Sequence, residues 1–308
     1  MKISVVISAY NEEKMIEDCL KSAKLVADEI IVVNNSSVDD TEKISKRYAK
    51  VFTKPNDPVN LNKNKNFGFT KATGDWIISL DADERIPSEL AEEIRKTVTS
   101  QPSTINGYDI PRKNIIFGKW IQHSIWWPDY NLRLFKKGKG RFAQKHVHEK
   151  LDLDGEVGKL QNPMIHYNYQ TVSQFINKLN RTYTESEAEN FIKSGNNIYW
   201  FDAIRWPTND FVKTFFFEKG YKDGMHGLIL SMFQAFYALV FFAKVWERKE
   251  NFKDLFTNTP TKQSNFLLSV IKEFQQASKD IRYWIFETLM DQNPAKKVYY
   301  KLRRKIDK

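Results

Sequence analysis

The sequence predicts an α/β protein with a mostly parallel sheet and a helical C-terminal region. Over the first hundred residues, strand patterns alternate with helix patterns, and the strands are continuous apolar runs, as expected for a sheet covered on both faces. Polar groups follow three of these strands, in "AYNEE", "NNSSVDDT" and "DADE". Because the carboxyl ends of parallel strands meet at one edge of a sheet, we expect these groups to share a functional site.

Apolar periodicity predicts the elements in chain order. It indicates strands at 3–10, 29–35 and 75–80 and helices at 12–26 and 39–51. The polar stretch "PNDPVNLNKNKN", residues 55–66, predicts a loop before the third strand. Pro87 and Ser88 then mark the start of the helix "PSELAEEIRK".

Composition places the chain among globular proteins. The 308 residues are 41% hydrophobic and 28% charged, which allows a full α/β core and a second lobe. Cys19 is the only cysteine, so an intramolecular disulfide framework is excluded and a reducing compartment is expected. The opening "MKISVVISAY" is predicted to be a first strand and not a signal peptide. These features favour a cytoplasmic protein.

Positive charge is concentrated towards the C-terminus. The formal net charge is +10, and residues 240–308 contain 15 Lys and Arg residues against 8 Asp and Glu residues. Such a basic segment is compatible with nucleic acid, with an anionic membrane surface or with solubility alone. No recognisable RNA- or DNA-binding motif accompanies it, so nucleic acid is not an expected partner.

The apolar segment 228–243 favours contact with a membrane surface over a simple span. Its sixteen residues, "LILSMFQAFYALVFFA", give about 24 Å of helix, whereas a hydrocarbon core is about 30 Å thick. We therefore expect a helix half-sunk in the interface or packed on the rest of the protein. The basic, aromatic end "KKVYYKLRRKIDK" is typical of an anionic-leaflet contact, and an ordinary amphipathic helix with a soluble tail is the alternative.

Missing motifs narrow the way in which the chain can bind phosphate. A dinucleotide site would need GxGxxG after the first strand, and a P-loop would need GxxxxGK[ST]; the sequence has neither. Phosphate must therefore be held by a metal or by basic side chains. Asp81 and Asp83 end an apolar run two residues apart, so they predict carboxylates aimed at one cation or one phosphate-bound metal. A polar turn that closes the strand is the alternative.

Three motifs carry a family resemblance when they are taken in order. "VVISAYNEE", "VVNNSSVDDT" and "NKNFGFTKATGDWIISLDADE" resemble the nucleotide-sugar-binding half of the family 2 inverting glycosyltransferases. That family has the Rossmann-like GT-A fold, and the closest similarity is to the branch of lipopolysaccharide-core β-glucosyltransferases. The resemblance is good over residues 1 to about 170 and weaker to about 245.

The resemblance implies a metal-dependent hexosyltransferase. It would move a hexose from a nucleoside-diphosphate sugar similar to UDP-glucose to a glycan or lipid-linked acceptor in cell-surface polysaccharide or lipopolysaccharide synthesis. The alternative from another class is a non-catalytic homologue that binds nucleotide or glycan. The metal expected at Asp81 and Asp83 is Mg²⁺ or Mn²⁺; in the family, the residue at Asp83 is the ligand and that at Asp81 contacts ribose or sugar. Glu84 is either part of this group or the start of the next helix.

Further residues match the donor-binding positions of the family. Ala9, Tyr10 and Glu12 correspond to positions that pack on and bond the base and ribose, and Lys65 stands near the base and diphosphate. Asn34 replaces an Asp that commonly contacts the base. Because Asn both donates and accepts, this departure leaves the identity of the base open. A polar turn capping the following helix is an additional interpretation of Asn34.

The acceptor side is predicted from "PDYNLRLFKKGKGRFAQKHVHEKL". By resemblance, Glu149 is the general base that takes the proton from the acceptor hydroxyl, and His148 orients the acceptor or the diphosphate. Arg133 contacts diphosphate or acceptor, or forms a structural ion pair. A plain surface strand is the alternative for "HVHE". His166, in "IHYNY", also matches the family, and packing is its expected role.

These assignments predict three regions. Residues 1–170 form the catalytic domain, with a donor half at 1–100 and an acceptor half at 101–170. Residues 171–256 form a helical region, and residues 264–308 form basic amphipathic helices. With the apolar segment and the basic end together, the protein is expected to lie on the cytoplasmic face of the cell membrane as a peripheral protein.

Overall fold

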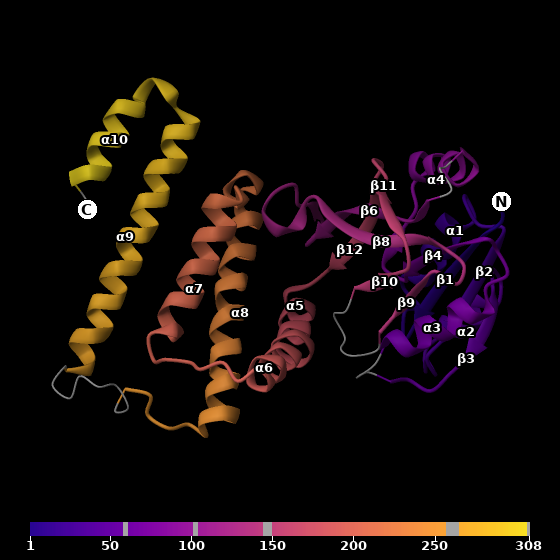
Figure 1. Cartoon of the computed structure of the whole chain (residues 1–308), viewed down its shortest axis with the longest axis horizontal. Coiled ribbons are helices and arrows are strands. Elements are labelled where there is room, and N and C mark those ends of the chain that lie inside the picture. The colour runs from indigo at the N-terminus through magenta and orange to yellow at the C-terminus, as the bar shows by residue number, and fades with distance from the viewer. Residues whose placement is uncertain (58–60, 101–103, 144–149, 257–264, 307–308) are drawn as a thin grey trace. The chain divides into compact units, whose positions relative to one another are not determined.

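The computed structural model describes residues 1–57, 61–100, 104–143, 150–256 and 265–306 (Figure 1). The chain forms two compact units, of which the first comprises residues 1–120 and 126–170. The second unit comprises residues 121–125 and 171–308. Each unit contains a buried hydrophobic cluster of its own.

The first unit is built on a mixed sheet (Figure 1). Its main strands are β1 Ile3–Ala9, β2 Glu29–Asn34, β3 Lys50–Thr53, β4 Trp76–Asp81, β5 Glu84–Arg85, β6 Ile105–Ile116, β8 Asp129–Lys136 and β12 Met164–Tyr169. They are arranged in the order β3–β2–β1–β4–β8–β6–β12–β5. The first four run parallel, and β8 is antiparallel to both of its neighbours. Four shorter strands complete the unit, namely β7 Lys119–Trp120, β9 Gly140–Phe142, β10 Leu151–Leu153 and β11 Glu156–Lys159.

Helices cover both faces of this sheet. They are α1 Ile16–Ala23, α2 Thr41–Ser45, α3 Leu61–Lys71 and α4 Ser88–Ser100. Alternate side chains of β1 enter different clusters: Val5 and Ile7 pack with residues of α1 and α4, whereas Val6 packs with Phe69 of α3. Continuous apolar strands follow from this arrangement, because neither face of the central strands meets water. Cys19 of α1 is fully buried, as its apolar pattern predicts.

The loop predicted over residues 55–66 is wrong in its second half, because residues 61–66 are the first turns of α3. Asparagine has low helix propensity, so no helical pattern is visible in this stretch of the sequence. In the fold, the Asn66 side chain donates to the carbonyl of Phe142 and accepts from its backbone N–H. Such tertiary contacts outweigh local propensity, and they place Lys65 on a helix.

Strand β12 joins segments that are distant in the sequence. It pairs in parallel with β6 and antiparallel with the two-residue strand β5. The register sets His166 of β12 opposite Glu84 of β5 and opposite Asn114 of β6. Three side chains from separate parts of the chain are therefore brought to one place in the sheet.

The second unit is helical (Figure 1). Its helices are α5 Val172–Lys178, α6 Thr184–Lys193, α7 Asp202–Val212, α8 Met225–Glu250, α9 Phe266–Gln292 and α10 Lys297–Ile306. Single irregular helical turns lie at Leu179–Tyr183, Lys213–Phe217, Gly220–Asp223 and Pro294–Lys296. Ala188 of α6 and Phe242 and Val245 of α8 are buried together, and Trp206 of α7 stacks on Phe241 with ring centroids 5.5 Å apart. Aromatic packing thus holds α6, α7 and α8 together.

Helix α8 is longer than the apolar segment that the sequence suggested. It has 26 residues, or about 39 Å of helix, because residues on both sides of 228–243 continue it. Among the described residues, α8 is the helix that is long and apolar enough to cross a membrane. The mean hydropathy of its most apolar 18-residue window is 1.8, and 28% of that window is buried. The length of α8 is therefore sufficient for a membrane span, whereas the apolar segment 228–243 alone was predicted to be too short. Core helices of soluble proteins meet the same criterion.

Candidate active site

The ends of three parallel strands form the floor of the candidate site. The register of β1 with β2 sets Ala9 beside Asn34, and the register of β1 with β4 sets Ser8 beside Asp81. The polar groups that follow these strands therefore lie at one edge of the sheet, as the sequence predicted. Ala9 itself is buried, so it forms part of this floor.

The loop after β1 is tied to the loop after β2 by hydrogen bonds. Asn11 has a left-handed backbone, with φ of 55°, and its N–H donates to Ser37 Oγ at 3.0 Å. The N–H of Glu12 donates to Thr41 Oγ1 at 2.7 Å. Tyr10, between these ties and the strand, leaves 42% of its surface exposed. The two loops thus present an aromatic ring at the edge of the sheet.

Asn34 is buried and holds the turn after β2. Its Nδ2 donates to Glu42 Oε2 at 2.7 Å, and its Oδ1 accepts from the N–H of Ser37 at 3.1 Å. Asp39 also accepts from the N–H of Thr41, the first residue of α2. Asn34 thus holds a polar turn, but the residue at the N-cap of α2 is Asp40, whose side chain makes no capping hydrogen bond. Both polar ends of the Asn34 side chain have partners within the protein.

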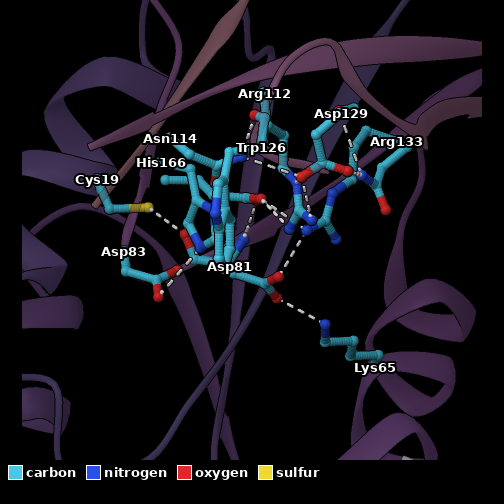
Figure 2. A network of polar contacts seen from close by, with 12 residues as sticks. Cys19, Lys65, Asp81, Asp83, Arg112, Asn114, Trp126, Asp129, Arg133 and His166 are labelled. Carbon is cyan, nitrogen blue, oxygen red and sulfur yellow. Dashed lines mark hydrogen bonds and ion pairs between the residues drawn. The ribbon is translucent and has the colours of Figure 1, made fainter. Parts of the chain in front are cut away.

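Asp81, the last residue of β4, lies between two cations (Figure 2). Its Oδ1 is 2.6 Å from Lys65 Nζ, and its Oδ2 is 2.7 Å from Arg133 Nη2. Burial alone would raise the pKa of Asp81, but Arg133 and Lys65 outweigh it and hold this pKa well below its usual range. The carboxylate is therefore ionised, and it orders two basic side chains from α3 and β8 at the edge of the sheet.

Glu84 is fully buried and supports the same group. Its Oε2 accepts from the backbone N–H of Asp81 at 2.9 Å, and its Oε1 accepts from Arg133 Nη2 at 2.6 Å. Arg112 Nη1 lies 3.8 Å from the same oxygen. Since a buried carboxylate is costly without charged partners, Glu84 and Arg133 depend on each other. Glu84 therefore belongs to the same polar cluster as Asp81. Arg133 forms the structural ion pairs that were one of its two predicted roles.

Asp83 lies next to His166, whose Nε2 is 3.5 Å from its Oδ2 (Figure 2). The other ring nitrogen, Nδ1, is 2.7 Å from Asn114 Oδ1. The sequence interpretation assigned His166 to packing and missed this contact. Only the pairing of β12 with β5 reveals it, and a two-residue strand such as β5 gives no periodic signal in the sequence.

The residues fit a divalent cation with open coordination positions. In the described ranges, no three His, Cys, Asp or Glu side chains are grouped so as to hold a metal ion by themselves. Asp83 and His166 nevertheless offer an oxygen and a nitrogen donor side by side, which suits Mn²⁺ and related ions. Both oxygens of Asp81 contact cationic side chains. Ligand atoms from outside the protein would have to complete the coordination.

The predicted acceptor-side pair lies outside the described residues. His148 and Glu149 belong to the stretch 144–149, so their assignments remain predictions from the sequence.

The comparisons with known proteins identify the family to which the chain belongs. A family model described as glycosyl transferase family 2 matches residues 4–151. An uncharacterised glycosyltransferase of Rickettsia typhi is 31% identical over 263 residues, which cover 80% of this chain and 87% of that protein. The chain belongs to glycosyltransferase family 2. The predicted resemblance and the predicted GT-A fold are thereby confirmed.

Two more distant similarities accompany these matches. The lipopolysaccharide core biosynthesis glycosyltransferase LpsC of Rhizobium meliloti is 25% identical over 258 residues, covering 80% of this chain and 93% of that protein. Among solved structures, glucosyl-3-phosphoglycerate synthase of Mycobacterium tuberculosis, in complex with Mn²⁺ and UDP-glucose, is 25% identical. It covers 36% of this chain and 43% of that chain, with a TM-score of 0.31.

Proposed function

We propose that this glycosyltransferase is an inverting hexosyltransferase. It transfers a hexose from a nucleoside-diphosphate sugar, UDP-glucose or a close analogue, to a glycan or lipid-linked acceptor in cell-surface polysaccharide or lipopolysaccharide synthesis. The observation that carries the proposal is the pairing of Asp81 with Lys65 and Arg133 at the carboxyl edge of the parallel strands. Similarity to the Rhizobium lipopolysaccharide core enzyme supports the acceptor class.

The first two loops form the nucleoside side of the proposed donor site. Tyr10 offers an exposed ring to the base, and Ala9 backs it at the end of β1. Glu12, on the same tied loop, accepts hydrogen bonds from ribose hydroxyls. Asn34 shapes the base pocket through the turn that it holds with Ser37.

Lys65 and Arg133 form the diphosphate side. Negative charge grows on the leaving diphosphate as the bond to the sugar breaks, and preorganised cations stabilise that charge. Asp81 keeps both side chains at the site before the donor binds, since each lies within 2.7 Å of its carboxylate. Asp81 then also contacts the ribose or the sugar, as the resemblance implies.

Asp83, with Asp81 beside it, binds the divalent cation, Mg²⁺ or Mn²⁺. When bound, such a cation neutralises charge on the diphosphate oxygens. Asp83 suits this role because its side chain is 24% exposed at the end of the sheet and a second donor, His166, lies beside it. Asp81 contributes negative charge to the same edge.

The acceptor half supplies the base. Glu149 takes the proton from the acceptor hydroxyl, whose oxygen forms a bond to the anomeric carbon. The bond from that carbon to the diphosphate oxygen breaks on the opposite face, and the diphosphate leaves with the electron pair, which inverts the configuration. His148 orients the acceptor or the diphosphate. If Glu149 has this role, Glu149→Gln keeps donor binding while transfer falls by about 10²-fold or more.

The second unit supports a peripheral position on the inner face of the cell membrane. On α8, the exposed residues Met232, Phe236 and Leu239 follow helical spacing along one face. On α10, the apolar residue Val298 is exposed in a helix whose sequence is strongly basic. An exposed apolar helix face and a basic amphipathic helix are both features of proteins that lie on anionic membranes.

Vesicle sedimentation tests this position. Deletion of residues 296–308 removes seven basic residues, each worth roughly 1 kcal/mol near an anionic surface, so it should weaken binding and its salt sensitivity together. Neutral vesicles serve as the comparison, and they should retain only a salt-resistant part due to α8. Full-length protein that stays in the supernatant with both vesicle types at low salt contradicts the membrane proposal.

Donor screening tests the catalytic proposal. Purified protein is incubated with a panel of nucleoside-diphosphate sugars and Mn²⁺ or Mg²⁺, and release of the nucleoside diphosphate is measured. One donor should be hydrolysed with a clear preference, and EDTA should abolish the reaction. Absence of hydrolysis and of binding for every donor with both metals would argue against a catalytic role.

A further inference from the structure

A line of polar contacts leads from Arg112 to Asp83 through the interior of the first unit (Figure 2). Arg112 Nη2 is 2.6 Å from Asp129 Oδ2, and the same oxygen is 3.2 Å from Asn114 Nδ2. Asn114 Oδ1 is 2.7 Å from His166 Nδ1, and His166 Nε2 is 3.5 Å from Asp83 Oδ2. Each side chain in this line contacts the next one. The donor and acceptor atoms of one side chain therefore determine the orientation of its neighbour.

The orientation of the Asn114 amide follows from its neighbours. Its Nδ2 lies 2.9 Å from the carbonyl oxygen of Trp126 and 3.2 Å from a carboxylate oxygen of Asp129. Both of these oxygens only accept hydrogen bonds, so an NH₂ group must face them. Arg112 contacts this Asp129 oxygen through both Nε and Nη2, which holds the carboxylate in place. The amide oxygen of Asn114 must therefore point to His166.

The tautomer of His166 follows from the amide. Asn114 Oδ1 only accepts, so His166 Nδ1 must carry the hydrogen. In the neutral ring, Nε2 then has a lone pair, and this lone pair lies on the side of Asp83. An imidazole nitrogen and a carboxylate oxygen that face each other are a donor pair for a divalent cation.

Burial makes this arrangement stiff. Asn114 is fully buried and His166 is 7% exposed, so water does not compete for the amide or for Nδ1. In metal sites of proteins, the ring nitrogen that does not bind metal usually donates to such a fixed acceptor, which sets the tautomer and the ring orientation.

We propose that Asn114, oriented by Asp129 and Arg112, is a positioning residue that fixes His166 with its Nε2 lone pair towards Asp83. His166 thereby gives the divalent cation of the proposed function, on which this inference rests, one nitrogen ligand. Because imidazole suits Mn²⁺ and Mg²⁺ prefers all-oxygen surroundings, the site selects Mn²⁺ over Mg²⁺.

The first test reads the tautomer directly in the metal-free protein. Long-range ¹H–¹⁵N spectra of protein labelled with ¹⁵N-histidine are recorded at about pH 8.5, where imidazoles are neutral. The spectrum of His166→Gln assigns the His166 signal among the five histidines. Wild type should show hydrogen on Nδ1, and Asn114→Leu should shift His166 towards the Nε2–H form. Hydrogen on Nε2 in wild type, or an unchanged spectrum in the variant, overturns the inference.

Two further variants make this result interpretable. Asn114→Ala removes the same acceptor without adding bulk, and it replaces the leucine variant if that protein does not fold. Asn106→Leu is the matched control, because Asn106 lies on the same strand, β6, and its side chain donates to the loop carbonyl of Asp154. The control should leave the His166 signal unchanged.

The second test measures metal binding by electron paramagnetic resonance with MnCl₂ alone, and with MgCl₂ as competitor. Loss of the outer partner typically lowers metal affinity by about 10- to 100-fold, so Asn114→Leu should bind Mn²⁺ that much more weakly, and Asn106→Leu should match wild type. His166→Gln should also lose the preference for Mn²⁺ over Mg²⁺.

The outcomes separate this inference from the proposed function. Metal-dependent donor hydrolysis together with unchanged Mn²⁺ affinity in Asn114→Leu overturns the inference and leaves the proposed function standing. Wild-type protein that has hydrogen on Nδ1 but binds no Mn²⁺ overturns the ligand role of His166 and the metal part of the proposed function together.

Discussion

The two ends of the parallel strands use carboxylates in different ways. At the amino end, Glu29 accepts hydrogen bonds from Ser4, from Lys50 and from both the backbone and the hydroxyl of Thr73. Burial alone would raise the pKa of Glu29, but the bonds from Thr73, Lys50 and Ser4 lower it to about 2. One carboxylate thus joins the starts of neighbouring strands and the segment before β4.

At the carboxyl end, carboxylates and cations are interleaved. Asp81 and Glu84 share Arg133, and Lys65 contacts the exposed side of Asp81. Here the acids hold basic side chains that a phosphate group could also attract, whereas Glu29 holds mostly neutral donors. At the amino end the carboxylate stabilises the fold. At the carboxyl end the carboxylates also hold the two cations of the proposed donor site.

Glu84→Gln should give the largest loss of stability. The substitution removes the negative charge that balances the buried guanidinium of Arg133. Such changes lower the free energy of unfolding by about 3–5 kcal/mol. Urea unfolding at pH 7 measures the effect. The matched control is Asp154→Asn, because Lys139 and Asp154 are also 2.6 Å apart but Asp154 is 77% exposed, so little change is expected. Equal effects of the two variants would contradict the role of burial.

Asp83→Asn should show that the carboxyl end has a function beyond stability. The substitution keeps the shape of the side chain but removes one charge and one hard ligand, so sugar transfer should fall by about 10²–10³-fold. Unfolding in urea should be nearly unchanged, since Asp83 is partly exposed. Transfer close to the wild-type rate would show that Asp83 does not bind the metal.

Glu29→Gln should do the opposite, with a loss of stability and unchanged transfer. The folded-state pKa is about 2, and the unfolded value is near 4.5, so this group stabilises the fold fully above about pH 4.5. Its contribution of about 3 kcal/mol is lost as the pH falls from 4.5 towards 2. Unfolding curves between pH 7 and pH 2.5 should therefore converge for wild type and variant at the acid end. A constant difference across this range would refute the linkage.

Asn34→Ala should have the smallest effect of the four. It removes two hydrogen bonds of a buried amide, to Glu42 and Ser37, and about 1–2 kcal/mol is expected. Urea unfolding measures this loss, and donor affinity should decrease only as far as the turn loosens. A complete loss of donor binding with intact stability would instead identify Asn34 as a direct contact to the base.

The sequence was informative wherever a pattern is local. Continuous apolar runs and the polar groups after them were sufficient to predict β1, β2, β4 and their common edge. Asp81 and Asp83 were placed at this edge by the motif that directly follows the third predicted strand, and Lys65 was placed near the diphosphate by the family resemblance. The GT-A fold was implied by the family resemblance that these motifs carry when they are taken in order.

The sequence was uninformative wherever the position of a residue depends on distant partners. The first turns of α3 contain asparagines, whose helical state depends on contacts such as that of Asn66 with Phe142. Glu84 and His166 meet only because β5 pairs with β12, more than 80 residues later in the chain. Arg112 enters the group from β6 and has no motif of its own. Register between distant strands is set by packing of the whole sheet, and no local pattern records it.

The pairing of β12 with β5 limits where insertions and deletions can be accepted in this protein. Side chains alternate between the two faces of a strand, so inserting or deleting one residue within β12 would turn His166 to the opposite face. Length changes in the turn at 160–163, just before β12, would leave this alternation intact. Related chains should therefore tolerate insertions before Met164 and exclude them between Met164 and His166, even where the surrounding residues differ.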